Sequence, residues 1–447
     1  MSRRRALTLI VAGAVLAAVV VTVRGVTAAT VTFQQESLAL EPGDIRTIDA
    51  GTPVGIPLRG ALRWIVDPGW LGKMDERGGF HAGDISGSGT VTARLGPASA
   101  QIPVTVTCPK LAEMQGIRFD VSCGRAADVY VEVGANGGAV RAREEVDGEA
   151  DRVSRDLQIS SDRRFRVYYL GSEQSLVTAV SWLGRGFSSG PTVRESEAVY
   201  LDLVDVIAID QSQARLKDTA PVVRHELVHR SLRQFVGPSK IDAVPTWLNE
   251  GWAFLEESDS IWVRTEALLV AASSAHLDRL PSLVQLSDQG DWNRRTGIES
   301  LYQYYVASLA TQFLIDDITL PGLIRALKAM GTGQSFAQAL AQAVPDFDYD
   351  AFGKRFSDRV EALVPAYPGI VTARGSPDGV GSTVIAYGLR PGAPATLTTA
   401  GASERVFTGS VDAYGIYLKY LGAELPVGEY RVTFESDGRR FQVTAAR

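Results

Sequence analysis

Patterns of apolar and polar residues divide this chain into β-rich ends and a mixed centre. Up to Cys108 the sequence is Gly-rich and alternates apolar with polar positions, which is typical of short strands. After Pro365 and Pro368, short apolar runs punctuated by Pro-Gly turns predict a second β-rich region. Between these regions, apolar spacing of three and four predicts helices over residues 265–275, 304–314, 323–330 and 336–343.

Two segments ahead of these helices predict strands of one small twisted sheet. Phe165–Leu170 is rich in aromatic and β-branched residues. Glu197–Asp210 alternates and then becomes continuously apolar, which predicts a half-buried strand that enters the core. An extended peptide can add as a strand to the exposed edge of such a sheet. The sequence does not decide which strand lies at that edge.

The first thirty residues have the pattern of a membrane anchor or a signal peptide. Arg3, Arg4 and Arg5 precede an uncharged, mostly apolar stretch from Ala6 to Val23. A stretch of about 18 residues is long enough to span a bilayer, which predicts a single-pass anchor with the arginines inside. A cleaved signal peptide is the alternative, because residues 26–28 resemble a small-residue cleavage site, and the protein would then be secreted.

Composition and charge indicate how much folded structure the chain can form and which binding partners are not expected. With 447 residues, 45% of them hydrophobic, the chain can form a catalytic core and two small sandwiches. The net charge is −6 and the basic residues beyond the N-terminus are scattered, so nucleic-acid binding is not indicated. The two cysteines, Cys108 and Cys123, lie close in sequence, and an oxidising compartment would favour a disulfide between them.

A helix carrying two histidines is predicted near the middle of the chain. Asp218 or Thr219 can cap its start, and Gly237 with the proline after it ends the pattern. His225 and His229 are four residues apart within it, so both imidazoles lie on one face and can bind one ion.

Two glutamates complete the predicted metal site. Glu226 lies beside the histidines, where a carboxylate can take a proton from a metal-bound water. Hydrolytic zinc sites usually keep three protein ligands and one water. Glu250, in a second helix-like segment, is the candidate for the third ligand. The sequence therefore predicts a Zn²⁺ site with ligands His225, His229 and Glu250.

Together, the two segments resemble the gluzincin clan of zinc metallopeptidases, which includes thermolysin and the aminopeptidases. The nearer match is to the minimal, mostly bacterial peptidase-MA-like domains, which share the Pro-x-Trp-Leu-Asn-Glu-Gly helix found here from Pro245. The resemblance covers residues 110–368. It implies a zincin-type α+β catalytic domain with the same three ligands and with Glu226 as the general base. The segment before Cys108 resembles a bacterial immunoglobulin-like domain.

The chain also departs from these relatives. It lacks the Gly-x-Met-Glu-Asn segment with which the aminopeptidases hold a substrate's amino terminus, so endopeptidase action is expected. Phe254 stands where the thermolysin pattern has an Asp that orients one histidine. Another acceptor must orient the histidine, and Asp205, Asp210 and Asp218 are open candidates.

A tyrosine is the expected donor to the oxyanion. In the resembling enzymes this Tyr stands ahead of a Leu on a later helix, and Tyr304 with Leu314 matches the pattern. Tyr302 and Tyr305 are alternatives if the alignment slips. Aromatic residues at helical spacing also commonly pack a core, so the role of Tyr304 stays open.

These observations predict a membrane-anchored, extracytoplasmic, zinc-dependent endopeptidase acting on peptide or protein substrates. The expected fold is multidomain, an α+β zincin-type catalytic domain flanked by two small all-β, Ig-like sandwiches that act as spacers or bind cell-surface material. The alternative is a catalytically silent surface module that keeps the metal-site fold for binding or scaffolding. Intact ligands and an intact Glu226 favour the enzyme. The expected segments are an anchor at 1–29, an Ig-like β domain at 30–108, the peptidase domain at 109–368 and a β-sandwich at 369–447.

Overall fold

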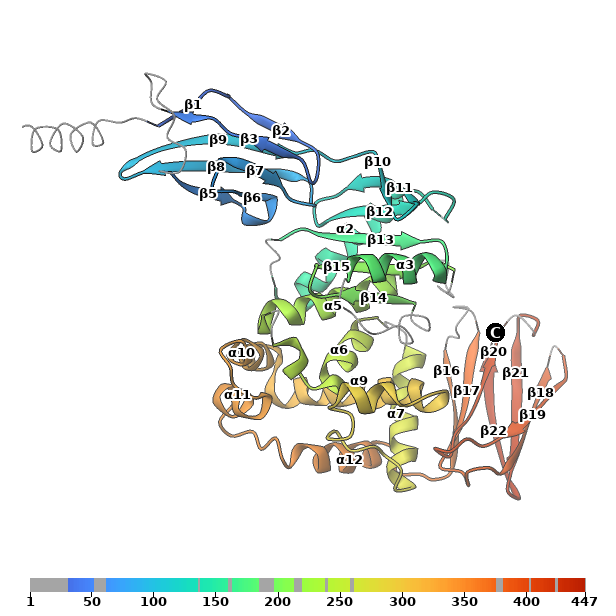
Figure 1. Cartoon of the computed structure of the whole chain (residues 1–447). Helices are drawn as coiled ribbons and strands as arrows, with labels where there is room; N and C mark the ends of the chain where they lie inside the picture. Colours follow the sequence, from blue (N-terminus) through green and yellow to red (C-terminus); the bar gives the residue numbers. More distant parts are fainter. Residues whose placement is uncertain are drawn as a thin grey trace, which may run out of the picture. The chain divides into compact units, whose positions relative to one another are not determined.

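The computed structural model describes residues 31–51, 62–135, 137–159, 163–184, 197–212, 219–237, 240–257, 261–374, 381–401, 403–422 and 425–446 (Figure 1). They fall into two compact units, one with residues up to 147 and 161–169, the other with 148–160 and everything from 170. The predicted membrane segment at 1–29 lies outside the described residues. Within the described ranges, no helix is long and apolar enough to cross a membrane.

The first unit begins with a β region that packs two sheets around one core. A four-stranded sheet has the order β2-β9-β8-β5 and a three-stranded sheet has the order β3-β7-β6. Buried side chains from both sheets, among them Leu40, Phe80 and Val104, form the shared core. The strands are β1 (Thr32–Phe33), β2 (Leu38–Leu40), β3 (Ile45–Thr47), β4 (Ala50–Gly51), β5 (Arg63–Asp67), β6 (Gly72–Met74), β7 (Gly79–Ala82), β8 (Gly87–Leu95) and β9 (Ala98–Val106).

A six-stranded sheet follows, in the order β10-β11-β12-β13-β15-β14. β12 and β13 are parallel, whereas the pairs β10–β11, β11–β12 and β14–β15 are antiparallel. The strand predicted from Phe165 is confirmed as β13. The strands are β10 (Leu111–Met114), β11 (Ile117–Cys123), β12 (Ala127–Glu132), β13 (Phe165–Leu170), β14 (Ala198–Leu201) and β15 (Val206–Asp210).

The single strand predicted over Glu197–Asp210 is wrong, because this segment forms a hairpin. β14 and β15 pair through a turn in which Asp205 has a φ of 54°, a left-handed conformation that Asp tolerates better than most residues. Leu203, which continued the apolar alternation, lies in this turn and is 70% exposed. The hairpin makes β14 an edge strand of the sheet.

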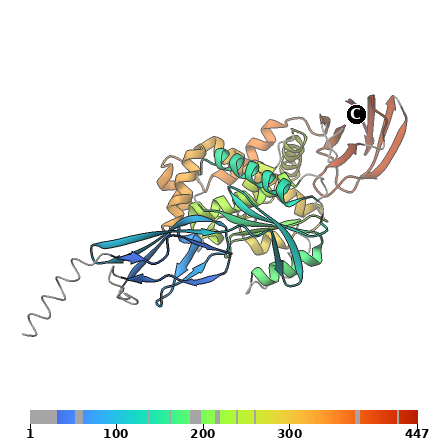
Figure 2. The same ribbon diagram turned by 90° about the horizontal axis from the view of Figure 1, so that it is seen from above.

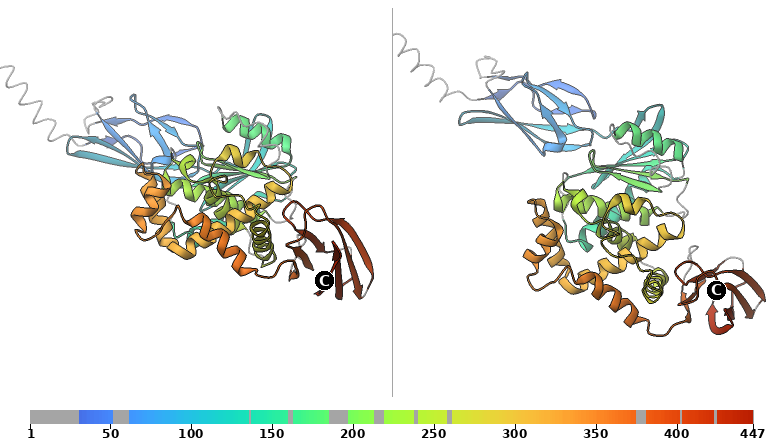
Figure 3. Two further views of the ribbon diagram at one scale, coloured as in Figure 1. Left: turned by 90° about the horizontal axis from the view of Figure 1, so that it is seen from below. Right: turned by 60° about the horizontal axis from the view of Figure 1, so that its bottom comes forward.

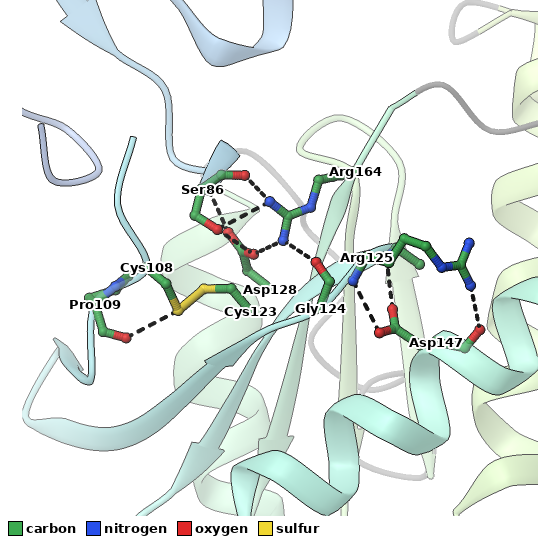
Figure 4. A network of polar contacts seen from close by, with 10 residues as sticks. Ser86, Cys108, Pro109, Cys123, Gly124, Arg125, Asp128, Asp147 and Arg164 are labelled. Atoms are coloured by element: carbon green, nitrogen blue, oxygen red, sulfur yellow. Dashed lines mark hydrogen bonds and ion pairs between the residues drawn. A yellow bond between two sulfur atoms is a disulfide. The ribbon is translucent and has the colours of Figure 1, made fainter. Parts of the chain in front are cut away.

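A disulfide and a buried ion pair brace the first unit where its β region meets the sheet (Figure 4). Cys108 and Cys123 are bonded to each other, as predicted. Asp128 on β12 is fully buried, accepts a hydrogen bond from the Ser86 hydroxyl at 2.9 Å and pairs with the Arg164 guanidinium. The buried carboxylate is therefore both paired and hydrogen-bonded, which offsets part of its desolvation.

We expect the double variant Cys108→Ser, Cys123→Ser to lower the free energy of unfolding of this unit by about 3 kcal/mol. The bridge restricts the conformations of the unfolded chain, and its loss restores that freedom. The bonded residues are 15 apart in sequence. Urea unfolding followed by circular dichroism measures the change, and the parent protein under reducing conditions should unfold like the variant. Identical midpoints for the oxidised parent and the variant would contradict the prediction.

The second unit contains α3, the hairpin of β14 and β15, and the helices that follow β15, and Figures 2 and 3 show them from other directions. The four predicted helices correspond to α7, α9, α10 and α11. The helices after α2 (Ala139–Asp156) are α3 (Glu173–Leu183), α5 (Ala220–Val236), α6 (Thr246–Glu257), α7 (Ile261–His276), α8 (Gln289–Asn293), α9 (Ile298–Ile318), α10 (Leu320–Gly331), α11 (Phe336–Ala343) and α12 (Phe352–Leu363).

The ends and packing of α5 and α6 follow from local sequence. Pro221 lies in the first turn of α5, and Gly237 ends the helix with a φ of 82°. Thr219 precedes α5 without a capping hydrogen bond from its side chain, and Asp218 lies outside the described residues. On α6, a Cβ added at Gly251 would lie 2.4 Å from the carbonyl oxygen of Ala307, so glycine permits the close approach of α9.

The C-terminal β region comprises β16–β22 and packs two sheets around a second core. The sheets have the orders β16-β17-β20 and β19-β18-β21-β22, and buried residues from both, such as Val384 and Val432, form the core. Helix α7 packs against β16 and β17. The strands are β16 (Gly369–Arg374), β17 (Ser382–Tyr387), β18 (Pro394–Gly401), β19 (Arg405–Ser410), β20 (Tyr417–Leu421), β21 (Glu429–Ser436) and β22 (Arg439–Ala446).

Candidate metal centre

Helices α5 and α6 bring three potential ligand atoms together. His225 and His229 lie on α5 and Glu250 lies on α6, with one ligand atom of each within 4.8 Å of the others. The two Nε2 atoms are 3.6 and 3.7 Å from Oε2 of Glu250. These separations are too long for a hydrogen bond, but they suit atoms that bind one ion at about 2.0–2.2 Å each. Two imidazoles and a carboxylate are the donor set of a hydrolytic zinc site with an open position, so these residues fit Zn²⁺.

The other nitrogen of each imidazole is held by a second acceptor. Nδ1 of His225 is 2.9 Å from Oε2 of Glu257, and Nδ1 of His229 is 2.9 Å from Oδ1 of Asn249. Both acceptors favour a proton on Nδ1 and leave the Nε2 lone pair directed toward Glu250. The orientation of both potential ligands is therefore set by residues of α6.

The acceptors expected from the sequence are not the ones that contact the histidines. Asp205 instead binds Arg230 at 2.8 Å, and Asp210 accepts from the hydroxyl of Ser212 at 2.6 Å. The third candidate, Asp218, lies outside the described residues. A helical repeat could have indicated Glu257, because it lies two turns after Glu250 on the same face of α6.

The charges around the centre favour a bound cation. Burial lowers the pKa of His225, but its interactions with Glu250 and Glu257 outweigh burial and raise that pKa well above its usual value. Burial raises the pKa of Glu250, and the two histidines more than offset this and lower it. For Glu226, 6% exposed beside His225, burial raises the pKa. Without a metal, the centre therefore stabilises positive charge on an imidazole beside the carboxylate.

Tyr304 on α9 is the tyrosine that lies beside the potential ligands. Its ring centroid is 6.4 Å from that of His225, 5.9 Å from that of Phe254 and 5.0 Å from that of Trp292. Phe254, which stands where an Asp was expected, thus packs against the tyrosine. Burial raises the pKa of Tyr304, so its hydroxyl keeps its proton at neutral pH and can donate it.

The two neighbouring tyrosines make their hydrogen bonds elsewhere. Tyr302 donates to Asp412, and Tyr305 donates to Glu266 at 2.9 Å. Both are almost fully buried. The catalytic role of Tyr304 remains a prediction, but the structure places it, rather than Tyr302 or Tyr305, next to His225.

Replacing Glu257 by Ala should weaken zinc binding by roughly 10- to 100-fold, because His225 loses the acceptor that orients it. Glu257→Gln keeps an acceptor, so its zinc affinity should lie between those of the parent and the alanine variant. Competition with a chromophoric chelator measures the affinity, and exposed Glu299 provides the control variant Glu299→Gln. Parent-like affinity in Glu257→Ala would show that this contact does not support the centre.

Glu266 should make the stability of the second unit depend on pH. It is 1% exposed, and burial raises its pKa to about 7, against 4.5 for an unperturbed Glu. Between these values the folded chain holds the proton and the unfolded chain has lost it, so stability is greatest at low pH and falls as the pH rises through 7. The loss amounts to about 3 kcal/mol. Unfolding in urea between pH 5 and 8 measures it. Glu266→Gln should remove this part of the slope, whereas an equal slope in both proteins would refute the assignment.

Comparisons with known proteins give only distant matches. No family model matches the chain, and no curated protein matches it. A substrate-bound mutant of an M1 zinc metallopeptidase from Deinococcus radiodurans is 14% identical with a TM-score of 0.29, covering 68% of this chain. This chain spans 61% of that protein.

Two further solved structures are similar at the same level. A second structure of the Deinococcus radiodurans enzyme is 18% identical with a TM-score of 0.30, covering 71% of this chain and 75% of that one. An aminopeptidase N family protein from Idiomarina loihiensis is 10% identical with a TM-score of 0.32. The match covers 88% of this chain and 74% of that protein. These values are too low to assign a family. The candidate centre therefore rests on its own geometry.

Proposed function

We propose that this protein is a zinc-dependent peptidase. The observation that carries the proposal is the convergence of His225, His229 and Glu250, whose facing ligand atoms lie 3.6 and 3.7 Å apart across α5 and α6. Their outer partners, Glu257 and Asn249, are already in hydrogen-bonding position. A structural role alone would not require two imidazoles to direct their free nitrogens at one carboxylate.

Each residue near the centre then has a chemical task. A bound zinc ion would supply a Lewis acid and lower the pKa of its water. Glu226, the buried carboxylate beside His225, would accept the proton of that water and pass it to the leaving amine. The hydroxyl of Tyr304 would donate a hydrogen bond to the developing oxyanion.

Endopeptidase action is the proposed specificity. The chain lacks the aminopeptidase segment that binds a free amino terminus, and β14 offers an edge to which an extended peptide could add. Helix α5, which carries both histidines, packs against β14. A peptide on this edge would therefore run beside the helix of the metal centre. The arginines and apolar segment at 1–29 support a location outside the cytoplasmic membrane, anchored or secreted.

A catalytically silent module with the same fold is the second candidate. It would use the metal centre for binding or scaffolding. The buried Glu226 favours the enzyme, because a scaffold has no need of a costly buried carboxylate that is not a ligand.

The test is zinc content together with cleavage of casein by the purified full-length protein. We expect one bound zinc, loss of cleavage after removal of the metal by a chelator, and recovery when zinc is returned. Zinc binding without cleavage of casein or of a peptide library would favour the silent module. Cleavage that survives complete removal of the metal would refute the proposal.

A further inference from the structure

Tyr304 lies on α9 between two tyrosines whose hydroxyl groups are bound away from the metal centre. Tyr302 donates to Oδ2 of Asp412, and Tyr305 donates to Oε1 of Glu266 at 2.9 Å. Residues three apart on a helix share a face, so Tyr302 and Tyr305 lie together and Tyr304 points to another side. The ring centroids of Tyr302 and Tyr305 are 6.0 Å apart, which agrees with a shared face. Two carboxyl groups, the partly buried Asp412 and the buried Glu266, therefore hold the side of α9 that carries Tyr302 and Tyr305.

The side chain of Asp412 is held by hydrogen bonds within its own loop. It belongs to the loop between β19 and β20 of the C-terminal β region, and its Oδ1 accepts from the backbone N–H groups of Tyr414 and Ile416 at 2.8 and 3.0 Å. Its other oxygen is left for Tyr302. The ring of Tyr414 also packs against that of Tyr302, with centroids 4.8 Å apart.

The same loop fits closely against α7. The hydroxyl of Ser273 donates to the carbonyl oxygen of Tyr414 at 2.7 Å and accepts from the N–H of Gly388 at 3.0 Å. Gly415 has a φ of 73°, and a Cβ there would lie 2.5 Å from the side chain of Leu277. The left-handed backbone at Gly415 favours glycine, and the loop packs closely against the residue that follows α7.

Glu266 provides a second connection to the C-terminal β region. This buried residue of α7 accepts from Tyr305, and its carboxyl group also interacts with Tyr420 on β20. Both tyrosines that flank Tyr304 on α9 are thus bound, directly or through one carboxyl group, to β-region residues.

We propose that the C-terminal β region aligns Tyr304 for catalysis, with Asp412 and Glu266 as positioning residues that act through Tyr302 and Tyr305. The proposal rests on the peptidase function proposed above. A donor to an oxyanion contributes only when it is placed correctly, and a shift of about 1 Å can cost up to 10²-fold in rate. The β region would then belong to the catalytic apparatus, in addition to any role as a spacer.

A double-mutant cycle in the full-length protein tests the kinetic consequence. Tyr302→Phe, and separately Asp412→Asn, should lower kcat by about tenfold with little change in KM, because substrate binding does not depend on the alignment of Tyr304. Combined with Tyr304→Phe, either change should have almost no further effect, since the group that it positions has already been removed. Losses that multiply fully in the double variants would overturn the proposal.

The matched control is Tyr367→Phe. Tyr367 lies just ahead of β16 and donates to the carbonyl oxygen of Ala272 on α7 at 3.1 Å, so its hydrogen bond joins the start of the C-terminal β region to α7 and not to α9. This variant should keep the parent kcat. A loss equal to that of Tyr302→Phe would mean that general loosening of this contact, rather than positioning, lowers activity.

A spectroscopic readout separates this proposal from the peptidase function. With 3-fluorotyrosine incorporated, the fluorine resonance of Tyr304 is identified by its absence in Tyr304→Phe. We expect Tyr302→Phe and Asp412→Asn to shift or broaden this resonance and Tyr367→Phe to leave it unchanged. Those shifts in a protein that cleaves nothing would support the positioning while refuting the peptidase function. An unchanged resonance in an active enzyme would overturn the positioning alone.

Discussion

Replacing Glu226 with Gln should lower the rate of peptide cleavage by about 10³-fold while one zinc ion stays bound. Glutamine has the same size and shape but cannot accept the proton of a water molecule, and Glu226 is not among the three converging ligand residues. The loss should therefore appear in kcat with zinc content unchanged. Steady-state kinetics on an unstructured protein and metal analysis of the same sample measure both quantities.

The exposed residue Glu429 provides the control for this change, because Glu429→Gln makes the same chemical substitution on the surface. It should keep parent activity. A Glu226→Gln protein that retained parent kcat would show that another group takes the proton. Loss of the metal from that protein would instead assign Glu226 to the support of the zinc site.

Replacing Glu250 with Ala should remove zinc binding and, with it, activity. Its Oε2 faces Nε2 of both His225 and His229, so its loss leaves only two ligands on α5. We expect a larger fall in zinc affinity than the roughly 10- to 100-fold cost of losing an outer partner. The neighbouring variant Asn249→Ala, which removes the acceptor from His229, provides that lower benchmark.

The affinities of the two variants can be compared in one competition assay with a chromophoric chelator. Far-ultraviolet circular dichroism checks that each variant is folded. If Glu250→Ala bound zinc as tightly as the parent, the third ligand would have to come from another residue and the proposed centre would be wrong.

Local periodicity was sufficient to predict much of the framework. The spacing of His225 and His229 places both side chains on one face of a helix, whatever surrounds that helix. The apolar repeats predicted α7, α9, α10 and α11, and apolar positions three and four residues apart are buried in each of these helices. The predicted strand at β13 and the disulfide between Cys108 and Cys123 are also confirmed.

Other features depend on contacts between residues distant in sequence. Helical spacing places Glu257 on the same face of α6 as Glu250, but its contact with His225, and that of Asn249 with His229, depends on the angle at which α6 meets α5. The hairpin of β14 and β15 depends on the backbone conformation of Asp205, which an alternating pattern does not reveal.

The sequence by itself determined the two metal-site helices, four of the helices that follow them, the pair of histidines and the chemistry of the candidate centre, because these depend on neighbours within one or two turns. Only the tertiary structure decided which of three adjacent tyrosines lies beside His225 and which carboxyl groups hold the other two. The Tyr302–Asp412 hydrogen bond joins residues 110 positions apart. Such a contact is specified by the packing of α9 and α7 against the C-terminal β region, and no local pattern encodes that packing.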